Sequence, residues 1–234
     1  TRFTHPGQLL ARLPKVRGKL SKNMILARYT WFRVGGPAEI LFSPADIIDL
    51  VEFVKGCPGD IPMSVIGVGS NLLVRDGGIR GIVIRLGRNF SNIEVKGTEI
   101  VAGAGALDIK LSRVSAEAGI GGLEFLAGVP GSIGGAVRMN AGAYGQEISD
   151  VLVSATVLDR TGQVTKYPAR KLGLRYRQSY LARDAIVLEA KFRGEQEPIS
   201  VITSRIHKIT EARETSQPVR DRTSGSTFVN PSGL

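Results

Sequence analysis

The sequence contains little that could bind a metal or form a disulfide. Its 234 residues include one cysteine, Cys57, and two histidines, His5 and His207. A single cysteine excludes an internal disulfide and a metal cluster held by several thiolates. Two histidines far apart in the sequence argue against a histidine-rich metal site. We therefore expect no metal ion, and the scarcity of cysteine fits a reducing cytoplasm.

Long apolar runs are also missing. No stretch approaches the ~18 apolar residues that a helix needs to cross a bilayer. The first residues, Thr1 to His5, are not followed by the apolar segment of a signal peptide. With 42% hydrophobic residues, the chain can still bury the core of one large domain or two small ones. We expect a cytoplasmic protein with no membrane partner.

Positive charge is in excess, but it is not concentrated. The formal net charge is +10, and the basic residues are scattered along the chain. Surfaces that bind single-stranded nucleic acid interleave basic with aromatic residues, and this pattern is absent. We expect no nucleic-acid partner, and the charge fits a small ligand that carries phosphates.

Several catalytic and nucleotide-binding signatures are absent. No Gly-x-x-x-x-Gly-Lys-Ser/Thr sequence occurs, which excludes a P-loop kinase. Gly67-Val-Gly69 is followed by Leu72, where a Rossmann fingerprint needs its third glycine. No nucleophile elbow supports a Ser-His-Asp hydrolase.

Glycine, by contrast, is abundant and clustered. The stretch from Gly128 to Gly145 has few side chains large enough to build a core, and a Gly/Ser/Asn loop at 67–71 precedes it. Exposed backbone N–H groups in such segments hold phosphates. Without a ligand, the same residues could form a tight turn at 67–71 and a glycine-rich packing junction at 128–145. The length of the second stretch favours a ligand, because ordering it costs conformational entropy.

Hydrophobic periodicity and turn residues predict a mixture of strands and helices. Strands are expected over 38–42, 63–68, 82–86, 93–95, 100–102, 151–158, 164–167 and 185–192. Helices are expected over 7–13, over 44–56 with Ser43 as N-cap and Ile47, Ile48, Val51 and Val54 on the apolar face, over 107–118, and after a cap at Ser200. The remainder of residues 1–28 is expected to be irregular. Because the elements intermix without a regular βαβ alternation, the predicted fold class is α+β.

Six motifs follow one another in an order that is typical of a single family. They are Tyr29-Thr-Trp-Phe-Arg-Val-Gly-Gly-Pro-Ala38, Gly67-Val-Gly-Ser-Asn71, Gly128-Val-Pro-Gly-Ser-Ile-Gly-Gly135, Asn140-Ala-Gly-Ala-Tyr-Gly145, Tyr176-Arg-Gln-Ser179 and Gly225-Ser-Thr-Phe-Val-Asn-Pro231. In this order they resemble the UDP-N-acetylenolpyruvoylglucosamine reductases, flavoenzymes of peptidoglycan precursor synthesis. The resemblance covers nearly all of the chain from about residue 20.

The resemblance implies an FAD-binding fold of the vanillyl-alcohol-oxidase type, with two α+β subdomains that grip FAD and a small α+β substrate domain. The implied first subdomain spans 1–75, with an N-terminal tail over about 1–20. The second spans 76–214, and 215–234 begins a truncated substrate domain. The short subtype is implied, because Tyr180 runs quickly into the strand at Ala185.

The resemblance also implies residues that bind FAD. The first pyrophosphate loop corresponds to Gly67, Gly69, Ser70 and Asn71. The second corresponds to Gly128, Pro130, Gly131, Ser132, Gly134 and Gly135. Asn140, Ala141 and Gly142 correspond to the chain along the flavin, and Gly35 and Gly36 to a close approach in the first subdomain. FAD is expected to be non-covalent, because His5, His207 and Cys57 all lie outside the glycine loops.

The implied reaction is the NADPH-dependent reduction of the enolpyruvyl ether of UDP-N-acetylglucosamine to UDP-N-acetylmuramate. Hydride comes from N5 of FAD, Ser226 supplies the proton, and Arg177 stabilises the enolate charge. Tyr144, Arg213 and Asn230 are implied substrate contacts, and the protein is expected to be a monomer. From the residues alone, a surface cation is the better interpretation of Arg177 and a capping serine that of Ser226, and only the resemblance reverses this.

The sequence departs from the family at the third catalytic residue, a glutamate near the C-terminus, for which no residue here can be assigned. Val229 also replaces the family's usual lysine. We expect the chain to bind FAD without full reductase activity. Two alternatives stay open: another FAD-dependent sugar or lactone oxidoreductase of the same fold, and a non-catalytic nucleotide-binding protein.

Overall fold

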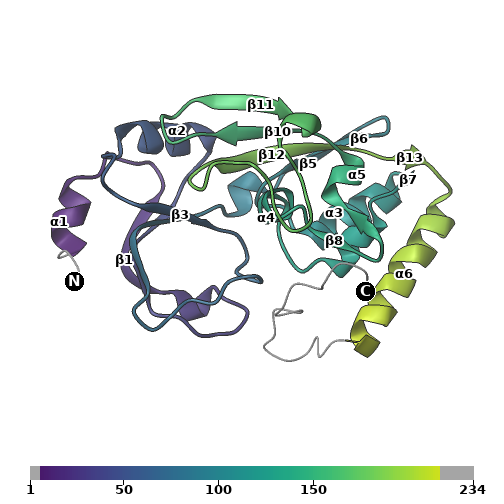
Figure 1. Cartoon of the computed structure of the whole chain (residues 1–234), viewed down its shortest axis with the longest axis horizontal. Coiled ribbons are helices and arrows are strands. Elements are labelled where there is room, and N and C mark those ends of the chain that lie inside the picture. The colour runs from purple at the N-terminus through teal and green to yellow at the C-terminus, as the bar shows by residue number, and fades with distance from the viewer. Residues whose placement is uncertain (1–5, 217–234) are drawn as a thin grey trace.

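Two β-sheets organise the computed structural model, which describes residues 6–216 (Figure 1). The first sheet has four strands in the order β1-β2-β4-β3. Their bounds are Lys19–Ile25 for β1, Pro37–Ser43 for β2, Met63–Ile66 for β3 and Ile79–Arg85 for β4. β1 runs antiparallel to β2, whereas β2 and β3 both run parallel to β4. The carboxyl ends of three strands therefore point the same way.

The second sheet is antiparallel throughout and has the order β11-β10-β12-β6-β5. Its strands are β5 (Ile93–Lys96), β6 (Glu99–Gly103), β10 (Leu152–Leu158), β11 (Val164–Pro168) and β12 (Ile186–Arg193). Two short pairs join β7 (Ile120–Gly121) to β13 (Glu195–Gln196), and β8 (Gly142–Ala143) to β9 (Gln146–Glu147). Sheets and helices without a repeated βαβ unit confirm the predicted α+β class.

The helices cover the sheets and connect them. The α-helices are α1 (Pro6–Ala11), α2 (Ile47–Gly56), α3 (Asp108–Glu117), α4 (Ile133–Arg138), α5 (Ile148–Val151) and α6 (Ile199–Ser216). Single 3₁₀ turns are η1 (Leu26–Arg28), η2 (Arg88–Phe90), η3 (Glu124–Gly128) and η4 (Ala169–Lys171). Between residues 6 and 216, no helix combines the length and apolarity needed to span a bilayer.

The expected boundary between the subdomains, after residue 75, would detach β4 from its sheet. β4 is an inner strand of the four-stranded sheet and pairs with both β2 and β3. The antiparallel sheet begins with β5 at Ile93. We therefore propose that the boundary lies between β4 and β5.

One hydrophobic cluster contains residues of both sheets. The first half of the molecule is the part up to β4, and the second half is the part from β5 onward. Phe42 and Phe53 of the first half are fully buried, with ring centroids 4.2 Å apart. The same cluster includes Leu158 of β10 and Ile186 and Leu188 of β12, which belong to the second sheet. In Figure 1 the β10–β11 hairpin reaches over toward α2. The two halves therefore pack as one body around apolar side chains from both.

Arg160, in the β10–β11 hairpin, fastens the second sheet to the first half. Its guanidinium donates to the backbone carbonyl of Pro58 at 2.8 Å and to that of Ile61 at 3.2 Å. A third donation reaches the carbonyl of Val54 in α2 at 3.5 Å. These contacts fix the spacing between the halves, where the glycine loops lie.

Replacing Arg160 with alanine is expected to lower the free energy of unfolding by about 1–3 kcal/mol, because carbonyls at the end of α2 lose a charged donor. Thermal unfolding of the purified protein measures the effect. Arg12 is a suitable control, since it pairs with Asp60 beside the same helix but is exposed. Equal losses of thermal stability in Arg160→Ala and Arg12→Ala would contradict the proposed role.

Several local predictions are wrong, each for an identifiable reason. Residues 19–25 form β1 despite their lack of apolar alternation, because they pair with β2 at the sheet edge. Helix α2 begins at Ile47, since the Asp46 carboxylate accepts the N–H of Asp49 at 2.9 Å and caps the helix. Its buried face is also different: Ile48 is 63% exposed. Helix α6 begins at Ile199, one residue before the predicted cap.

The expectation that residues 128–145 cannot build a core is also wrong. This stretch contains α4, whose Ile133, Ala136 and Val137 are buried in the larger hydrophobic cluster. The small residues pack α4 closely against the sheet: a Cβ on Gly134 would stand 2.9 Å from the Cβ of Ala104. Part of the glycine content therefore serves packing.

Candidate functional site

Loop 67–71 directly follows β3, at the carboxyl end of the parallel strands. Across the described residues, its five backbone N–H groups donate to no backbone or side-chain acceptor. Gly69 and Ser70 are buried, whereas Asn71 is exposed. A row of N–H groups without protein partners is suited to an anion.

The shape of this loop is set by the motif at 29–38. Gly69 has φ +71, and a Cβ there would overlap the carbonyl oxygen of Tyr29 and stand 2.9 Å from the Cα of Thr30. The N–H of Trp31 donates to the carbonyl of Gly69 at 3.1 Å. Only glycine can adopt this conformation at this distance from another backbone segment.

The two predicted pyrophosphate loops lie against each other. A Cβ on Gly67 would collide with the hydroxyl oxygen of Ser132. A Cβ on Gly131 would stand 3.9 Å from the hydroxyl oxygen of Ser70. Segments about 60 residues apart in the sequence thus meet at two glycines, as the prediction of one shared site requires.

Only some N–H groups of the second loop are available to a ligand. Those of Ile133 and Gly134 donate to the carbonyls of Ala106 and Ala104, both at 2.9 Å. Those of Gly131, Ser132 and Gly135 find no acceptor among residues 6–216, and Pro130 has no N–H. The donors that face outward therefore cluster around Gly131.

The second half of the glycine stretch folds back on the first. The β8–β9 hairpin brings Tyr144 against Gly128, where a Cβ would stand 2.5 Å from the tyrosine ring. Asn140 is fully buried at φ +41; its amide oxygen accepts the N–H of Ser149 at 2.9 Å, and its nitrogen donates to the carbonyl of Arg175 at 3.2 Å. The carbonyl of Ala141 accepts the N–H of Ile148 at 2.9 Å. The side chain of Asn140 therefore connects the backbone at Ser149 to the backbone at Arg175.

Gly35 and Gly36 have a packing explanation of their own. Gly35, at φ +130, would place a Cβ 2.8 Å from that of Val74, and a Cβ on Gly36 would overlap the carbonyl of Asp76. The N–H of Gly36 donates to the carbonyl of Arg75 at 3.0 Å. Contact with the segment that follows loop 67–71 is enough to require glycine at both positions.

Arg177 lies beside the end of the glycine stretch. Its backbone is at φ +56, its guanidinium is 4.7 Å from the centre of the Tyr176 ring, and it donates to the carbonyl of Gly142 at 2.9 Å. The structure thus brings a cation to the segment predicted to run along the flavin.

The other predicted substrate contacts are spread out. Tyr144 is 49% exposed at φ +54. Arg213 lies in the last turn of α6, and within the described part of the chain its Nε is buried without a hydrogen-bond partner. Ser226 and Asn230 lie outside the described residues.

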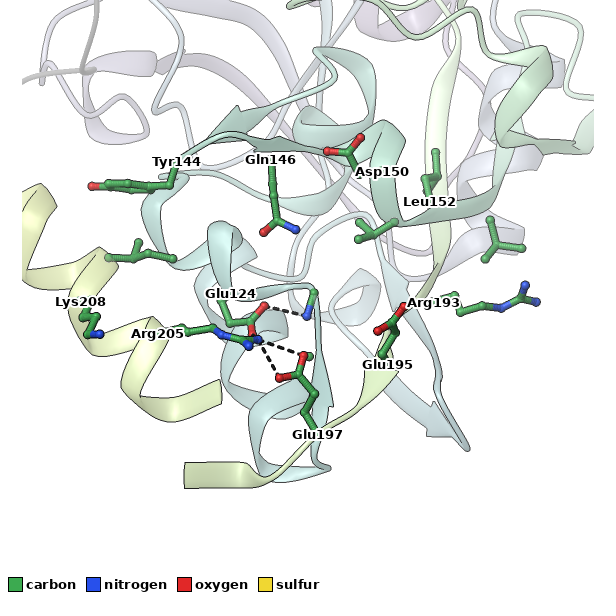
Figure 2. A pocket seen from close by; sticks show the side chains of 16 residues that line it. Glu124, Tyr144, Gln146, Asp150, Leu152, Arg193, Glu195, Glu197, Arg205 and Lys208 are labelled. Atoms are coloured by element: carbon green, nitrogen blue, oxygen red, sulfur yellow. Dashed lines mark hydrogen bonds and ion pairs between the residues drawn. The ribbon is translucent and has the colours of Figure 1, made fainter. Parts of the chain in front are cut away.

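A hollow of about 920 Å³ lies between α6 and the β8–β9 hairpin (Figure 2). Arg205 at its floor donates to the carboxylates of Glu124 and Glu197, at 3.0 and 2.9 Å. Of the predicted site residues, Tyr144 alone is among those that line it, and the glycine loops do not. Three cations line it: Arg205 is paired with Glu124 and Glu197, Arg193 is paired with Glu99, and Lys208 is the third.

Asp108, at the start of α3, is the residue that the sequence prediction missed. It is fully buried, and its carboxyl oxygen would stand 2.6 Å from a Cβ on Gly131. Burial raises the pKa of the Asp108 carboxyl well above its usual range. An acidic residue in the first turn of a helix is ordinary in a sequence, so no pattern marked it out.

Comparisons with known proteins agree with this geometry. The model of an FAD binding domain family matches residues 38–167. A UDP-N-acetylenolpyruvoylglucosamine reductase from Azorhizobium caulinodans is 52% identical over 225 residues, which cover 96% of this chain and 73% of that protein. The reductase from Parvibaculum lavamentivorans is 53% identical over 225 residues, with the same shares covered.

Solved structures show the same architecture. The UDP-N-acetylenolpyruvylglucosamine reductase from Thermus caldophilus superposes with a TM-score of 0.80 at 34% identity, over 93% of this chain and 76% of that one. The 6-hydroxy-D-nicotine oxidase from Arthrobacter nicotinovorans, at 21% identity and a TM-score of 0.59, covers 78% of this chain and 43% of that one and shows the fold alone. The predicted FAD-binding fold is thereby confirmed. This chain belongs to the family of UDP-N-acetylenolpyruvoylglucosamine reductases.

Proposed function

We propose that this protein is an NADPH-dependent flavoenzyme, a cytoplasmic monomer that reduces the enolpyruvyl ether of UDP-N-acetylglucosamine to UDP-N-acetylmuramate. The observation that carries the proposal is the contact between loop 67–71 and the loop around Gly131. Unpaired N–H groups gather there, in a chain about half identical to reductases of this name. The motifs at 29–38 and 140–145 contact these two loops: Trp31 donates to the carbonyl of Gly69, and Tyr144 lies against Gly128.

The residues at the contact fit the diphosphate of FAD. A Cβ on Gly67 would collide with the hydroxyl of Ser132, and one on Gly131 would stand 2.6 Å from Asp108 Oδ2, so neither position has room for a side chain. Their N–H groups, with the hydroxyls of Ser70 and Ser132 and the amide of Asn71, supply donors that need no counter-ion in the protein. These groups would hold FAD without a covalent bond, and FAD bound there would supply hydride chemistry with NADPH as its reductant.

Arg177 and Ser226 would act on the enolpyruvyl group. As hydride bonds to the β-carbon, the carbon–carbon π bond breaks and negative charge gathers on the carboxylate oxygens. Arg177 stabilises this charge with a guanidinium that is already oriented by Gly142 and Tyr176. The hydroxyl of Ser226 then gives a proton to the α-carbon and recovers one from water.

Substrate contacts are proposed for Tyr144, Arg213 and Asn230. Tyr144 is the exposed side chain nearest to Gly128. The unpaired Nε of Arg213 is a donor suited to a phosphate or a sugar oxygen. Neither a nucleic acid nor a membrane is a proposed partner.

A spectrum and a coupled assay test this function. The purified protein is expected to be yellow, with flavin absorption. Its NADPH oxidation is expected to fall short of the full reductase rate and to occur only when the enolpyruvyl substrate is added. A protein that stays colourless after incubation with FAD would overturn the proposal. Flavin that remains on the protein after acid precipitation, or NADPH oxidation that needs only oxygen, would instead favour an oxidase of the same fold.

A further inference from the structure

The buried carboxyl of Asp108 has no role in the activity described above. Its backbone N–H donates to the carbonyl of Gly131 at 3.2 Å, and a bridge between Leu107 and Ser132 continues this contact. The first turn of α3 is thus fastened to the second glycine loop. The side chain of Asp108 therefore lies behind the proposed diphosphate site.

Both oxygens of this carboxyl are enclosed and make no hydrogen bond within residues 6–216. A buried polar group without a partner is costly, so proteins rarely keep one without a use. A hydrogen-bond partner for the Asp108 carboxyl can be sought beside Gly131, which has no side chain. Its missing Cβ would stand 2.6 Å from Asp108 Oδ2 and 3.9 Å from Ser70 Oγ, so both oxygens border the same gap. Ser70 Oγ likewise makes no hydrogen bond to any described residue.

No charged group compensates the carboxylate form of Asp108. The segments 67–71, 103–107 and 128–135 contain no titratable side chain. The 3₁₀ helix η3 also packs against α3 and carries Glu124, whose carboxylate is paired with Arg205 of α6. On α3 itself, Lys110, Arg113 and Glu117 are exposed, on the opposite side from the buried carboxyl. Burial alone raises the pKa of Asp108 and so favours the neutral acid over the carboxylate.

A neutral carboxyl and a carboxylate would orient Ser70 in opposite ways. The two side chains are not hydrogen-bonded to each other in the structure. With its carboxyl turned toward Ser70 Oγ, the neutral acid would donate its proton there and leave the hydroxyl hydrogen of Ser70 free to point toward a phosphate oxygen. A carboxylate can only accept, so it would turn that hydrogen inward and add a negative charge behind the anion.

We propose that Asp108 is a positioning residue for the diphosphate of FAD, acting through the hydroxyl of Ser70 across the gap left by Gly131. The inference rests on the proposed FAD site at these loops. It assigns to Gly131 a second purpose, since any side chain there would separate the carboxyl from the hydroxyl.

Titration of the apoprotein with FAD, followed by flavin fluorescence from about pH 5 to about pH 10, tests the proposal. Asp108→Ala is expected to weaken FAD binding about tenfold, and Asp108→Asn by less than about threefold, because an amide N–H can replace the acid proton. Wild-type affinity is expected to fall at the alkaline end, while that of Asp108→Asn stays constant. Combining Asp108→Ala with Ser70→Ala should weaken binding no further than Ser70→Ala alone.

Ser112→Ala is the matched control. Ser112 lies one turn along the same buried face of α3, but its hydroxyl faces the carbonyl of Glu124, so its loss should leave FAD affinity unchanged. Equal weakening by Asp108→Asn and Asp108→Ala, or additive losses in the double variant, would overturn the proposal. If Asp108→Ala does not fold, an Asp108→Asn profile with the wild-type pH dependence overturns it. A wild-type protein that binds no FAD at any pH would instead refute the proposed function itself.

Discussion

Gly69→Ala is expected to weaken FAD binding by about 100-fold. A Cβ at this position meets the backbone of Tyr29 and Thr30, and the backbone is at φ +71. Left-handed strain and overpacking against a backbone together cost about 3 kcal/mol or more, so loop 67–71 must move. A displacement of that cost corresponds to an increase in the FAD dissociation constant of about 100-fold. Fluorescence titration of the apoprotein with FAD measures it.

Gly97→Ala separates the clash from the backbone strain. Gly97 lies between β5 and β6 at φ +61, and a Cβ there meets nothing within 4 Å. This variant should lose about 1–2 kcal/mol of stability and keep its FAD affinity. Should Gly69→Ala bind FAD as tightly as Gly97→Ala does, the N–H groups of loop 67–71 would not belong to the cofactor site.

Arg177→Ala is expected to lower kcat for reduction of the enolpyruvyl substrate by about 10²–10³, the cost of removing one preorganised donor from a developing oxyanion. Reduction of the bound flavin by NADPH should keep its rate, because no enolate forms in that half of the reaction. The kcat of Arg177→Lys should lie between those of the wild type and Arg177→Ala, because lysine keeps the positive charge but lacks the paired N–H donors of a guanidinium. Stopped-flow absorbance of the flavin resolves the two half-reactions.

Arg175 provides the comparison for this experiment. Its guanidinium also lies over an aromatic ring, that of Tyr180 at 5.0 Å, but its side chain is exposed and makes no contact with Gly142 among the described residues. Arg175→Ala should leave both half-reactions near wild-type rates. If flavin reduction slows as much as substrate reduction in Arg177→Ala, the arginine supports the cofactor and not the enolate.

The sequence was sufficient to identify the two loops of the proposed site because their most distinctive residues are glycines. Loop 67–71 and the segment around Gly131 are recognisable by residue type, and the structure places them in contact as expected. A glycine that faces a ligand and one that faces another backbone look the same in a sequence, however. Gly134 and Gly36 are of the second kind, and only the distances to Ala104 and Asp76 reveal it.

The other differences between the sequence predictions and the structure arise from contacts between residues that are far apart in the sequence. The strand β1 is stabilised by pairing with β2, which no local pattern in residues 19–25 announces. The rotation of α2 depends on the Asp49 carboxylate, which accepts the N–H groups of Arg17, Gly18 and Ala45 and turns Ile48 outward. The burial of Asp108 depends on loops that approach from two sides. Local periodicity carries no information about any of these.

The hydrophobic cluster shared by the two sheets has a consequence for how the protein is made. Phe42, Phe53 and their neighbours are enclosed only when Ile186 and Leu188 of β12 pack against them. During synthesis from the N-terminus, the four-stranded sheet is complete at Arg85, yet about 100 further residues must emerge before its core can close. The cofactor loops are therefore assembled late, and long-range closure rather than local structure is expected to set the folding rate.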